Sequence, residues 1–200
     1  MPLYGLGVDL GWLAIVPAYL LGTLPTAVMV GRRYGRDLTA EGSGNPGASN
    51  AWRTLGRRAA AVVLIGDMGK GALAAGMGWV IGGRALGVGC ALAAVVGHVA
   101  PLTRRFRGGK GVATLVGAAL VLLPVVMAVL GVAWALIVRI GGVAAAGSLV
   151  VAAGLPVGAA LTGRSPAEVA MWAAAGLVVI TRHRDNIGRL RRGEEPSLSD

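Results

Sequence analysis

Long apolar runs constrain this chain more than any other feature of its sequence. Hydrophobic residues make up 55% of the 200 residues and charged residues only 14%, whereas a soluble domain of this size needs a more highly charged surface. Several runs approach the roughly 20 residues that a helix needs to cross a bilayer. The chain is therefore expected to be an all-α, polytopic integral membrane protein.

The number of crossings depends on one ambiguous run. Residues 112–138 form an apolar run with Pro124 in its middle, too long for one crossing and too short for two full ones. We expect it to split at Pro124 into two short, closely packed helices, which gives seven transmembrane helices. The other apolar runs occupy residues 10–30, 59–82, 85–101, 143–161 and 169–180.

The distribution of basic residues predicts the orientation. With seven crossings, the loops at 31–58, 103–111 and 139–142 share one side with the C-terminal tail, and together they hold 16 of the 19 Lys and Arg residues. Because basic loops stay in the cytoplasm, the tail is expected there and the N-terminus outside. This explains the net charge of +10 without nucleic-acid binding. The remaining basic residues are Lys70, Arg84 and Arg164.

No internal repeat or separate soluble domain is visible, so residues 1–200 are expected to form a single membrane-embedded domain. The N-terminal run lacks the basic start and clear cleavage site of a signal peptide, and it is interpreted as a span. Cys90 is the only cysteine, which excludes an intrachain disulfide and a cysteine-based metal site.

Three polar segments interrupt the apolar pattern, and each has features of an anion-binding loop. The first, at residues 40–53, reads AEGSGNPGASNAWR; it is expected to be a loop and a poor helix. Its glycines let backbone N–H groups converge on phosphate oxygens, its Ser and Asn side chains add neutral hydrogen bonds, and Arg53 adds charge. The residues concerned are Gly42, Ser43, Gly44, Asn45, Gly47 and Asn50.

The second segment, at 97–114, reads GHVAPLTRRFRGGKGVAT, and the third, at 182–195, reads RHRDNIGRLRRGEE. In the second, Gly108, Gly109 and Gly111 flank Lys110 directly before a span, where the lysine can act as a point charge on a phosphate. In the third, His183 and Asn186 share a helical face, with Arg182 and Arg189 nearby. Each segment alone has a plainer interpretation, as a turn, a topology determinant or a lipid-headgroup contact.

Asp67 and Lys70 lie inside a nominal span, three residues apart, so they can face each other on a helix. Ionisable side chains at membrane depth are costly and usually line a polar cavity. A structural or substrate-lining role is favoured over direct chemistry.

In this order, GSGNPGASNAWR, DMGKG at 67–71, GHVAP with FRGGKGVAT, and RHRDNIGRL resemble the bacterial acyl-phosphate-dependent glycerol-3-phosphate acyltransferases over nearly the whole chain. The resemblance implies a seven-helix inner-membrane enzyme with its active site at the cytoplasmic face. It also implies the first acylation step of phospholipid synthesis, in which an acyl group passes from acyl phosphate to glycerol 3-phosphate. The products are lysophosphatidic acid and inorganic phosphate. A functional link to an acyl-phosphate-producing enzyme follows.

The resemblance and the anion-binding chemistry of the three segments together assign residues. The expected catalytic group is Ser43, Arg53, Lys110, His183 and Asn186. The expected substrate-binding group is Gly42, Gly44, Asn45, Gly47, Asn50, His98, Gly108, Gly109, Gly111, Thr114, Arg182 and Glu195. The sequence departs from the family where Thr39 replaces a frequent arginine, which places one phosphate contact in doubt.

The chemistry agrees with these assignments. A hydroxyl attacking an acyl phosphate has a good leaving group, so it needs proximity and anion stabilisation rather than a covalent intermediate. The proton acceptor stays open between Ser43, His183 and a phosphate oxygen of the substrate. No carboxylate cluster indicates a metal, and no cofactor is expected.

Two alternatives come from other classes of protein. An anion transporter would also gather glycine loops and basic residues, but it would be expected to show inverted repeats and a midplane site. A metal-dependent phospholipid phosphotransferase would call for several aspartates around Mg²⁺, whereas the nine acidic residues here are scattered.

Overall fold

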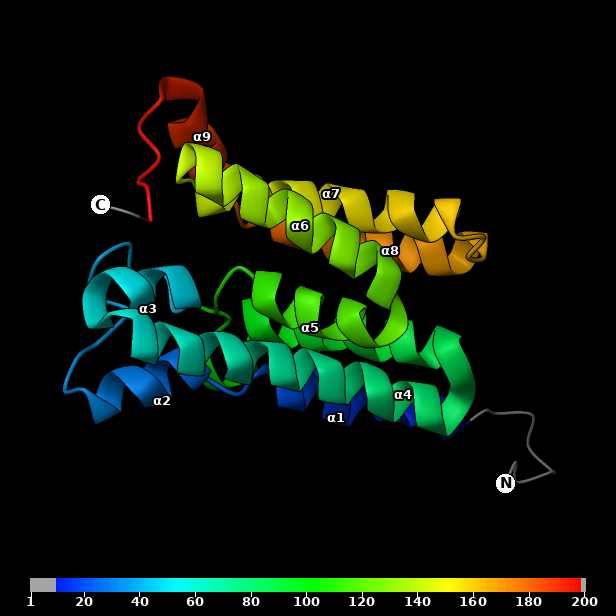
Figure 1. Cartoon of the computed structure of the whole chain (residues 1–200). Helices are drawn as coiled ribbons and strands as arrows, with labels where there is room; N and C mark the ends of the chain where they lie inside the picture. Colours follow the sequence, from blue (N-terminus) through cyan, green and yellow to red (C-terminus); the bar gives the residue numbers. More distant parts are fainter. Residues whose placement is uncertain (1–9, 199–200) are drawn as a thin grey trace.

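The computed structural model describes residues 10–198, and every regular element within that range is helical. Figure 1 shows the long helices running roughly side by side, with the polar loops, α3 and α9 at one end. The α-helices are α1 (Ile15–Gly22), α2 (Thr26–Arg33), α3 (Ala48–Leu55), α4 (Arg57–Val99), α5 (Val112–Leu122), α6 (Pro124–Gly141), α7 (Ala144–Leu161), α8 (Pro166–Thr181) and α9 (Arg184–Arg192). Two short 3₁₀ helices occupy Leu10–Ala14 and Leu102–Arg104.

Helix α4 is two antiparallel helices joined by a glycine turn. Its backbone leaves helical geometry at Gly82 and at Gly83, where φ is +75°, a value that glycine adopts without strain. The two halves then pack closely: a Cβ on Gly78 would lie 2.7 Å from the carbonyl oxygen of Leu86 and 2.8 Å from the sulfur of Cys90. Small residues allow this approach, as expected for helices in lipid.

The apolar run at residues 112–138, whose number of crossings was ambiguous in the sequence, is divided into two helices at Pro124. Helix α5 stops at Leu122, and Pro124 occupies the first position of α6, where its missing N–H costs nothing. The predicted split at Pro124 is therefore confirmed. Helix α5 has 11 residues, about 16 Å of helix, too short to cross a bilayer alone.

The first apolar run, expected as one span, is broken. Helix α1 ends at Gly22 and α2 begins at Thr26 after Pro25, because proline cannot continue the hydrogen-bond ladder. The break exposes a carbonyl that a distant side chain satisfies: the Lys70 ammonium donates a hydrogen bond of 3.0 Å to the oxygen of Leu24.

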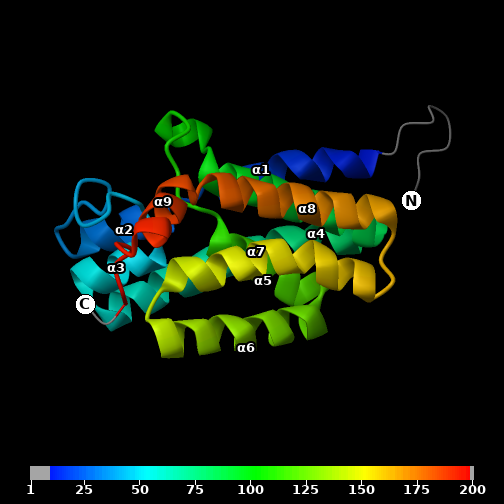
Figure 2. The ribbon, with the colours of Figure 1, turned by 90° about the horizontal axis from the view of Figure 1, so that it is seen from above.

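The main hydrophobic core joins α4, α5, α7 and α8 with the first turn of α6. Trp172 of α8 is fully buried within it, beside Leu115, Leu122 and Leu155. Helix α6 lies at one edge beside α7 (Figure 2). Only 11% of its residues are buried, against 61% of an apolar 18-residue window within Arg57–Arg104, so most of α6 is available to lipid.

Four stretches within residues 10–198 are long and apolar enough to cross a membrane: Gly11–Arg33, Arg57–Arg104, Pro124–Gly141 and Ala144–Leu161. The second of these contains both halves of α4. Helices α5 and α8 are apolar but shorter. The protein is thus a multi-pass membrane protein that is all-helical over residues 10–198.

Candidate active site

The first polar segment is organised by the side chain of Asn50, which is 1% exposed. Its amide nitrogen donates to the carbonyl oxygens of Leu38 at 2.9 Å and Glu41 at 3.0 Å, and its Oδ1 accepts the backbone N–H of Ser43 at 2.9 Å. Gly42 turns the chain with φ +60°, and a Cβ there would collide with the Asn50 oxygen. One buried amide therefore fixes the whole loop.

The expectation that residues 40–53 make a poor helix is wrong for their second half. Helix α3 begins at Ala48, directly after Gly47. It forms because Ala51 is buried against α4 and α2 in a small apolar cluster, while polar residues take the other face. The N-terminus of this helix reaches the cavity described below, and helix N-termini favour anions.

The second segment is held from both sides by backbone hydrogen bonds. The N–H groups of Gly108 and Gly109 donate to the carbonyl oxygens of Val99 and His98, each at 3.1 Å. The guanidinium of Arg182 donates to the carbonyl oxygens of the same two glycines at 3.2 and 3.4 Å. These contacts fix the position from which Lys110 extends.

Lys110 belongs to a chain of polar contacts that joins the second and third segments. Its ammonium donates a 2.6 Å hydrogen bond to Oδ1 of Asn186, whose nitrogen donates to Glu195 at 2.5 Å. Arg189 donates to the other oxygen of Glu195 at 2.7 Å. Burial lowers the pKa of Lys110 to about 8, against the opposing effect of Glu195, and the positive charges of Arg189 and Arg53 lower it further.

His183 precedes α9 and is 2% exposed. Its Nδ1 lies 2.8 Å from the carbonyl oxygen of Val179, which can only accept, so Nδ1 carries the proton and Nε2 is the acceptor in the neutral ring. Burial lowers the pKa of His183 below its usual value, and the positive charge of Lys110 acts in the same direction.

Asp67 and Lys70 form the predicted pair, with Nζ and Oδ1 2.9 Å apart and both side chains 3% exposed. Nδ1 of His98 lies 3.6 Å from the same Asp67 oxygen. His98 in turn lies beneath the second segment, where a Cβ on Gly109 would collide with its Nε2. The pair therefore supports both the break after α1 and the loop that carries Lys110.

A cavity of about 440 Å³ brings these segments together. One end is polar, with side chains from all three segments. The other end is apolar and lies between the first half of α4 and helices α5, α6 and α7, where it is lined by Leu64, Met68, Val116, Met127, Trp134 and Val151 among others. The cavity is thus shaped for an amphiphile with an anionic head and an apolar chain.

Most of the predicted site residues line this cavity. They are Ser43, Asn45, Gly47, Asn50, Arg53, Asp67, His98, Lys110, Gly111, His183, Asn186 and Glu195. Five other predicted residues do not line it: Gly42, Gly44, Gly108, Gly109 and Arg182. Of these, Gly109 lines the smaller cavity described next. Thr114 is fully buried in α5, with its backbone against Gly71. Lys70 lines a smaller cavity beside Thr23 and Thr26.

Several other lining residues were not predicted from the sequence. Arg57 borders the cavity and stacks over the Trp52 ring, 5.2 Å from its centroid. Trp134 and Ser148 line the cavity wall, and Pro196 and Leu198 of the tail also border it. In residues 10–198, no three His, Cys, Asp or Glu side chains gather as metal ligands would.

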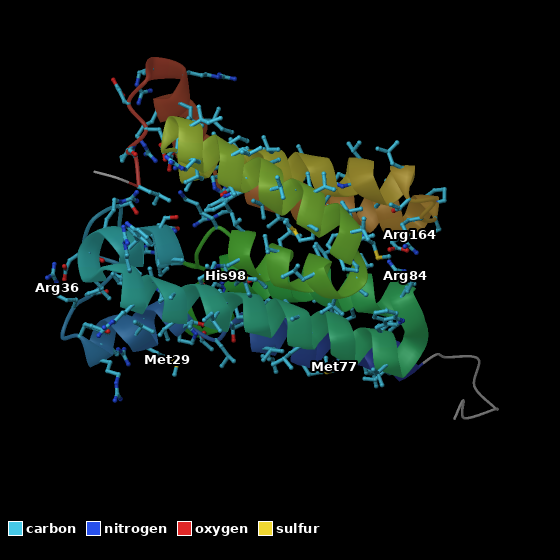
Figure 3. The ribbon with its side chains drawn as sticks, in the orientation of Figure 1. Met29, Arg36, Met77, Arg84, His98 and Arg164 are labelled. Carbon is cyan, nitrogen blue, oxygen red and sulfur yellow. The ribbon has the colours of Figure 1, made fainter. Side chains whose placement is uncertain are left out.

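Two of the three basic residues outside the basic loops and tail, Arg84 and Arg164, lie at the end of the molecule opposite the polar end (Figure 3). Figure 3 shows Arg84 and Arg164 at the far end from Arg36, with His98 between them. Arg84 pairs with the buried Glu168 at 2.8 Å and donates to the carbonyl oxygen of Leu122.

Comparison with known proteins decides the family. Residues 12–193 match the family described as glycerol-3-phosphate acyltransferase. The chain belongs to that family. It is 40% identical over 189 residues to a glycerol-3-phosphate acyltransferase of Bacillus cytotoxicus, covering 94% of this chain and 95% of the relative. A Rubrobacter xylanophilus enzyme of the same name is 39% identical, with 92% of each chain covered.

Two solved structures have the same fold. Both are crystal structures of PlsY (YgiH), an integral membrane glycerol 3-phosphate acyltransferase, one in a glycerol 3-phosphate form and one in a lysophosphatidic acid form. Their TM-scores are 0.89 and 0.87, each with 30% identity and 94% coverage of both chains. The protein is therefore an acyltransferase of the membrane.

Proposed function

We propose that this protein transfers an acyl group from an acyl phosphate to glycerol 3-phosphate. The products are lysophosphatidic acid and inorganic phosphate, as in the first acylation step of phospholipid synthesis. The observation that carries the proposal is the cavity of about 440 Å³ with an anion-binding polar end and an apolar end between helices. Residues 1–200 act as one membrane-embedded catalytic domain.

Two phosphate groups have to be held together at the polar end, although they repel each other. Arg53 and Lys110 supply positive charge there, and the N-terminus of α3 supplies N–H groups, whereas the N–H groups of Ser43, Gly108 and Gly109 are used inside the loops and shape them. Lys110 is fixed by Asn186 at 2.6 Å, so it is oriented before substrate binds. The other members of the expected substrate-binding group supply the remaining polar contacts to the two substrates.

The reaction is a direct displacement. The glycerol hydroxyl oxygen forms an ester bond with the acyl carbon, and the bond between that carbon and the phosphate oxygen breaks. The phosphate leaves with the bonding electron pair, stabilised by Arg53 and Lys110. The hydroxyl proton passes to an acceptor, for which Nε2 of His183, Ser43 and a substrate phosphate oxygen are the candidates. His183 is suited to this task because it is neutral with Nε2 unprotonated.

The membrane arrangement completes the proposal. The stretch Gly11–Arg33, the two halves of α4, and α5 to α8 supply seven crossings, in which the short α5 crosses together with the loop at residues 108–111 that leads into it. The N-terminus is then outside and the tail in the cytoplasm. The polar end then lies at the cytoplasmic face of the inner membrane, where both phosphate substrates are available. The acyl chain lies among helices and lipid, and an acyl-phosphate-producing enzyme supplies the donor.

The proposal is tested with purified protein in detergent or lipid, without nucleotide or added metal. Palmitoyl phosphate and glycerol 3-phosphate should give equal amounts of lysophosphatidate and inorganic phosphate. Palmitoyl coenzyme A is the matched alternative donor and should react poorly, because the short loops offer no evident site for its adenosine portion. Acylation from the thioester alone would overturn the choice of donor, and absence of lysophosphatidate from both donors would overturn the proposed function.

A further inference from the structure

Helix α6 contributes three residues to the apolar end of the cavity: Met127, Gly131 and Trp134. Their spacing of four and three places them on one face of the helix. Helix α6 runs from the far end of the molecule toward the polar end, so Met127 is the deepest of the three. It lies 14 positions before the end of the helix at Gly141, about 21 Å along the axis.

Gly131 differs from the glycines with which α6 and α7 pack. A Cβ on Gly147, Gly154 or Gly158 of α7 would collide with Trp134, Leu130 or Val126 of α6. These three glycines are explained by close helix packing. They also fix the rotation of α6, because these three side chains of α6 fit against them.

At Gly131 no such reason exists. A Cβ there would meet only the terminal carbon of Met127, at an ordinary 3.9 Å. The residue lies inside α6, where glycine weakens a helix relative to alanine, and α6 has an ordinary helical backbone there. Neither packing nor backbone geometry requires glycine at this position. What its missing side chain leaves open is the cavity itself.

We infer that Gly131 and Met127 set the length of acyl chain that the enzyme accepts. The empty side of Gly131 lets the chain pass Trp134 and continue to Met127, which is 4% exposed and belongs to the main core. Met127 closes the apolar end, and a larger residue at position 131 shortens it. This inference rests on the proposed function, because it takes the acyl chain of the donor as the occupant.

The test is a competition between decanoyl phosphate and palmitoyl phosphate, present in equal amounts with glycerol 3-phosphate. Mass spectrometry of the lysophosphatidate gives the ratio of kcat/KM for the two donors. Gly131→Leu should lower the palmitoyl-to-decanoyl ratio at least about tenfold, because several methylenes lose their buried site. Gly131→Ala should give an intermediate change.

Gly76→Leu is the matched control. A Cβ on Gly76 of α4 also meets nothing within 4 Å, and the residue does not line the cavity. This variant adds the same side chain to a membrane helix and should keep the wild-type ratio. Retained turnover of decanoyl phosphate shows that Gly131→Leu is folded.

An unchanged ratio in Gly131→Leu would overturn the inference, as would an equal change in Gly76→Leu. Should Gly131→Leu fold poorly, Gly131→Ala alone still decides, since a wild-type ratio there would also contradict the inference. Failure of the proposed function gives a different result, in which the wild-type protein makes lysophosphatidate from neither donor.

Discussion

The Lys110 ammonium donates a 2.6 Å hydrogen bond to Oδ1 of Asn186, a residue 76 positions later in the chain. Asn186 is held in turn by Glu195, which Arg189 also contacts. The neutral amide of Asn186, which is itself held by the Glu195–Arg189 pair, thereby fixes the flexible Lys110 side chain at the wall of the cavity. The positive charge of Lys110 is left for an anionic ligand rather than spent on a direct carboxylate partner.

Removing that charge should cost most of the activity. Lys110→Ala is expected to reduce kcat/KM by at least about 100-fold, because one charged donor in a low-dielectric phosphate site is worth several kcal/mol. Lys110→Arg keeps the charge and serves as the control, with a smaller loss. Steady-state assays with purified variants measure this, and near-normal turnover by Lys110→Ala would contradict the phosphate role.

The charge of Lys110 should also make phosphate affinity dependent on pH. The pKa of Lys110 is lowered to about 8, so the free protein loses this positive charge as pH rises through that value. The inhibition constant of inorganic phosphate, calculated for its dianion at each pH, should therefore rise between pH 7 and 9 in the wild type. In Lys110→Arg it should stay nearly flat, because arginine remains charged throughout. Parallel curves for both proteins would show that another group titrates.

The pair inside α4 should contribute to stability rather than chemistry. Asp67→Asn leaves the ammonium of Lys70, which is 4% exposed, without its carboxylate, and breaking a buried pair costs about 3–5 kcal/mol. The double variant Asp67→Asn/Lys70→Gln should recover much of this loss. Thermal unfolding in detergent measures both. A stable but inactive Asp67→Asn variant would instead assign Asp67 a role through His98, 3.6 Å away.

Local chemistry in the sequence predicted the parts of this fold that depend on neighbouring residues. Pro124 splits its run because proline both ends and begins helices, and Asp67 meets Lys70 because three residues make nearly one helical turn. The break after Gly22 was missed although Pro25 marks it. There the apolar composition of residues 10–30 outweighed the proline in the prediction.

Contacts between distant segments could not be predicted in the same way. The partner of Lys110 depends on how α8 directs the chain into α9, and the partner of the Leu24 carbonyl lies on another helix. Helix α3 was missed because its composition is poor for a helix, whereas burial of Ala51 and Ala48 against neighbouring helices stabilises it. The open side of Gly131 depends on the rotation of α6 against α7, which no local pattern records.

The proposed topology predicts opposite labelling of the two ends of the molecule. Single cysteines are placed in a Cys90→Ala background at exposed positions: Arg53, Arg107 and Arg191 at the polar end, and Thr162 in the turn between α7 and α8. Because the basic loops are expected in the cytoplasm, an impermeant thiol reagent should label intact cells only at Thr162→Cys. The other three should react only after permeabilisation.

Cys90 is fully buried, so its replacement removes background without altering the surface. Labelling of any polar-end cysteine from outside would contradict the seven-crossing arrangement, and labelling of Thr162→Cys only after permeabilisation would place the turn between α7 and α8 in the cytoplasm.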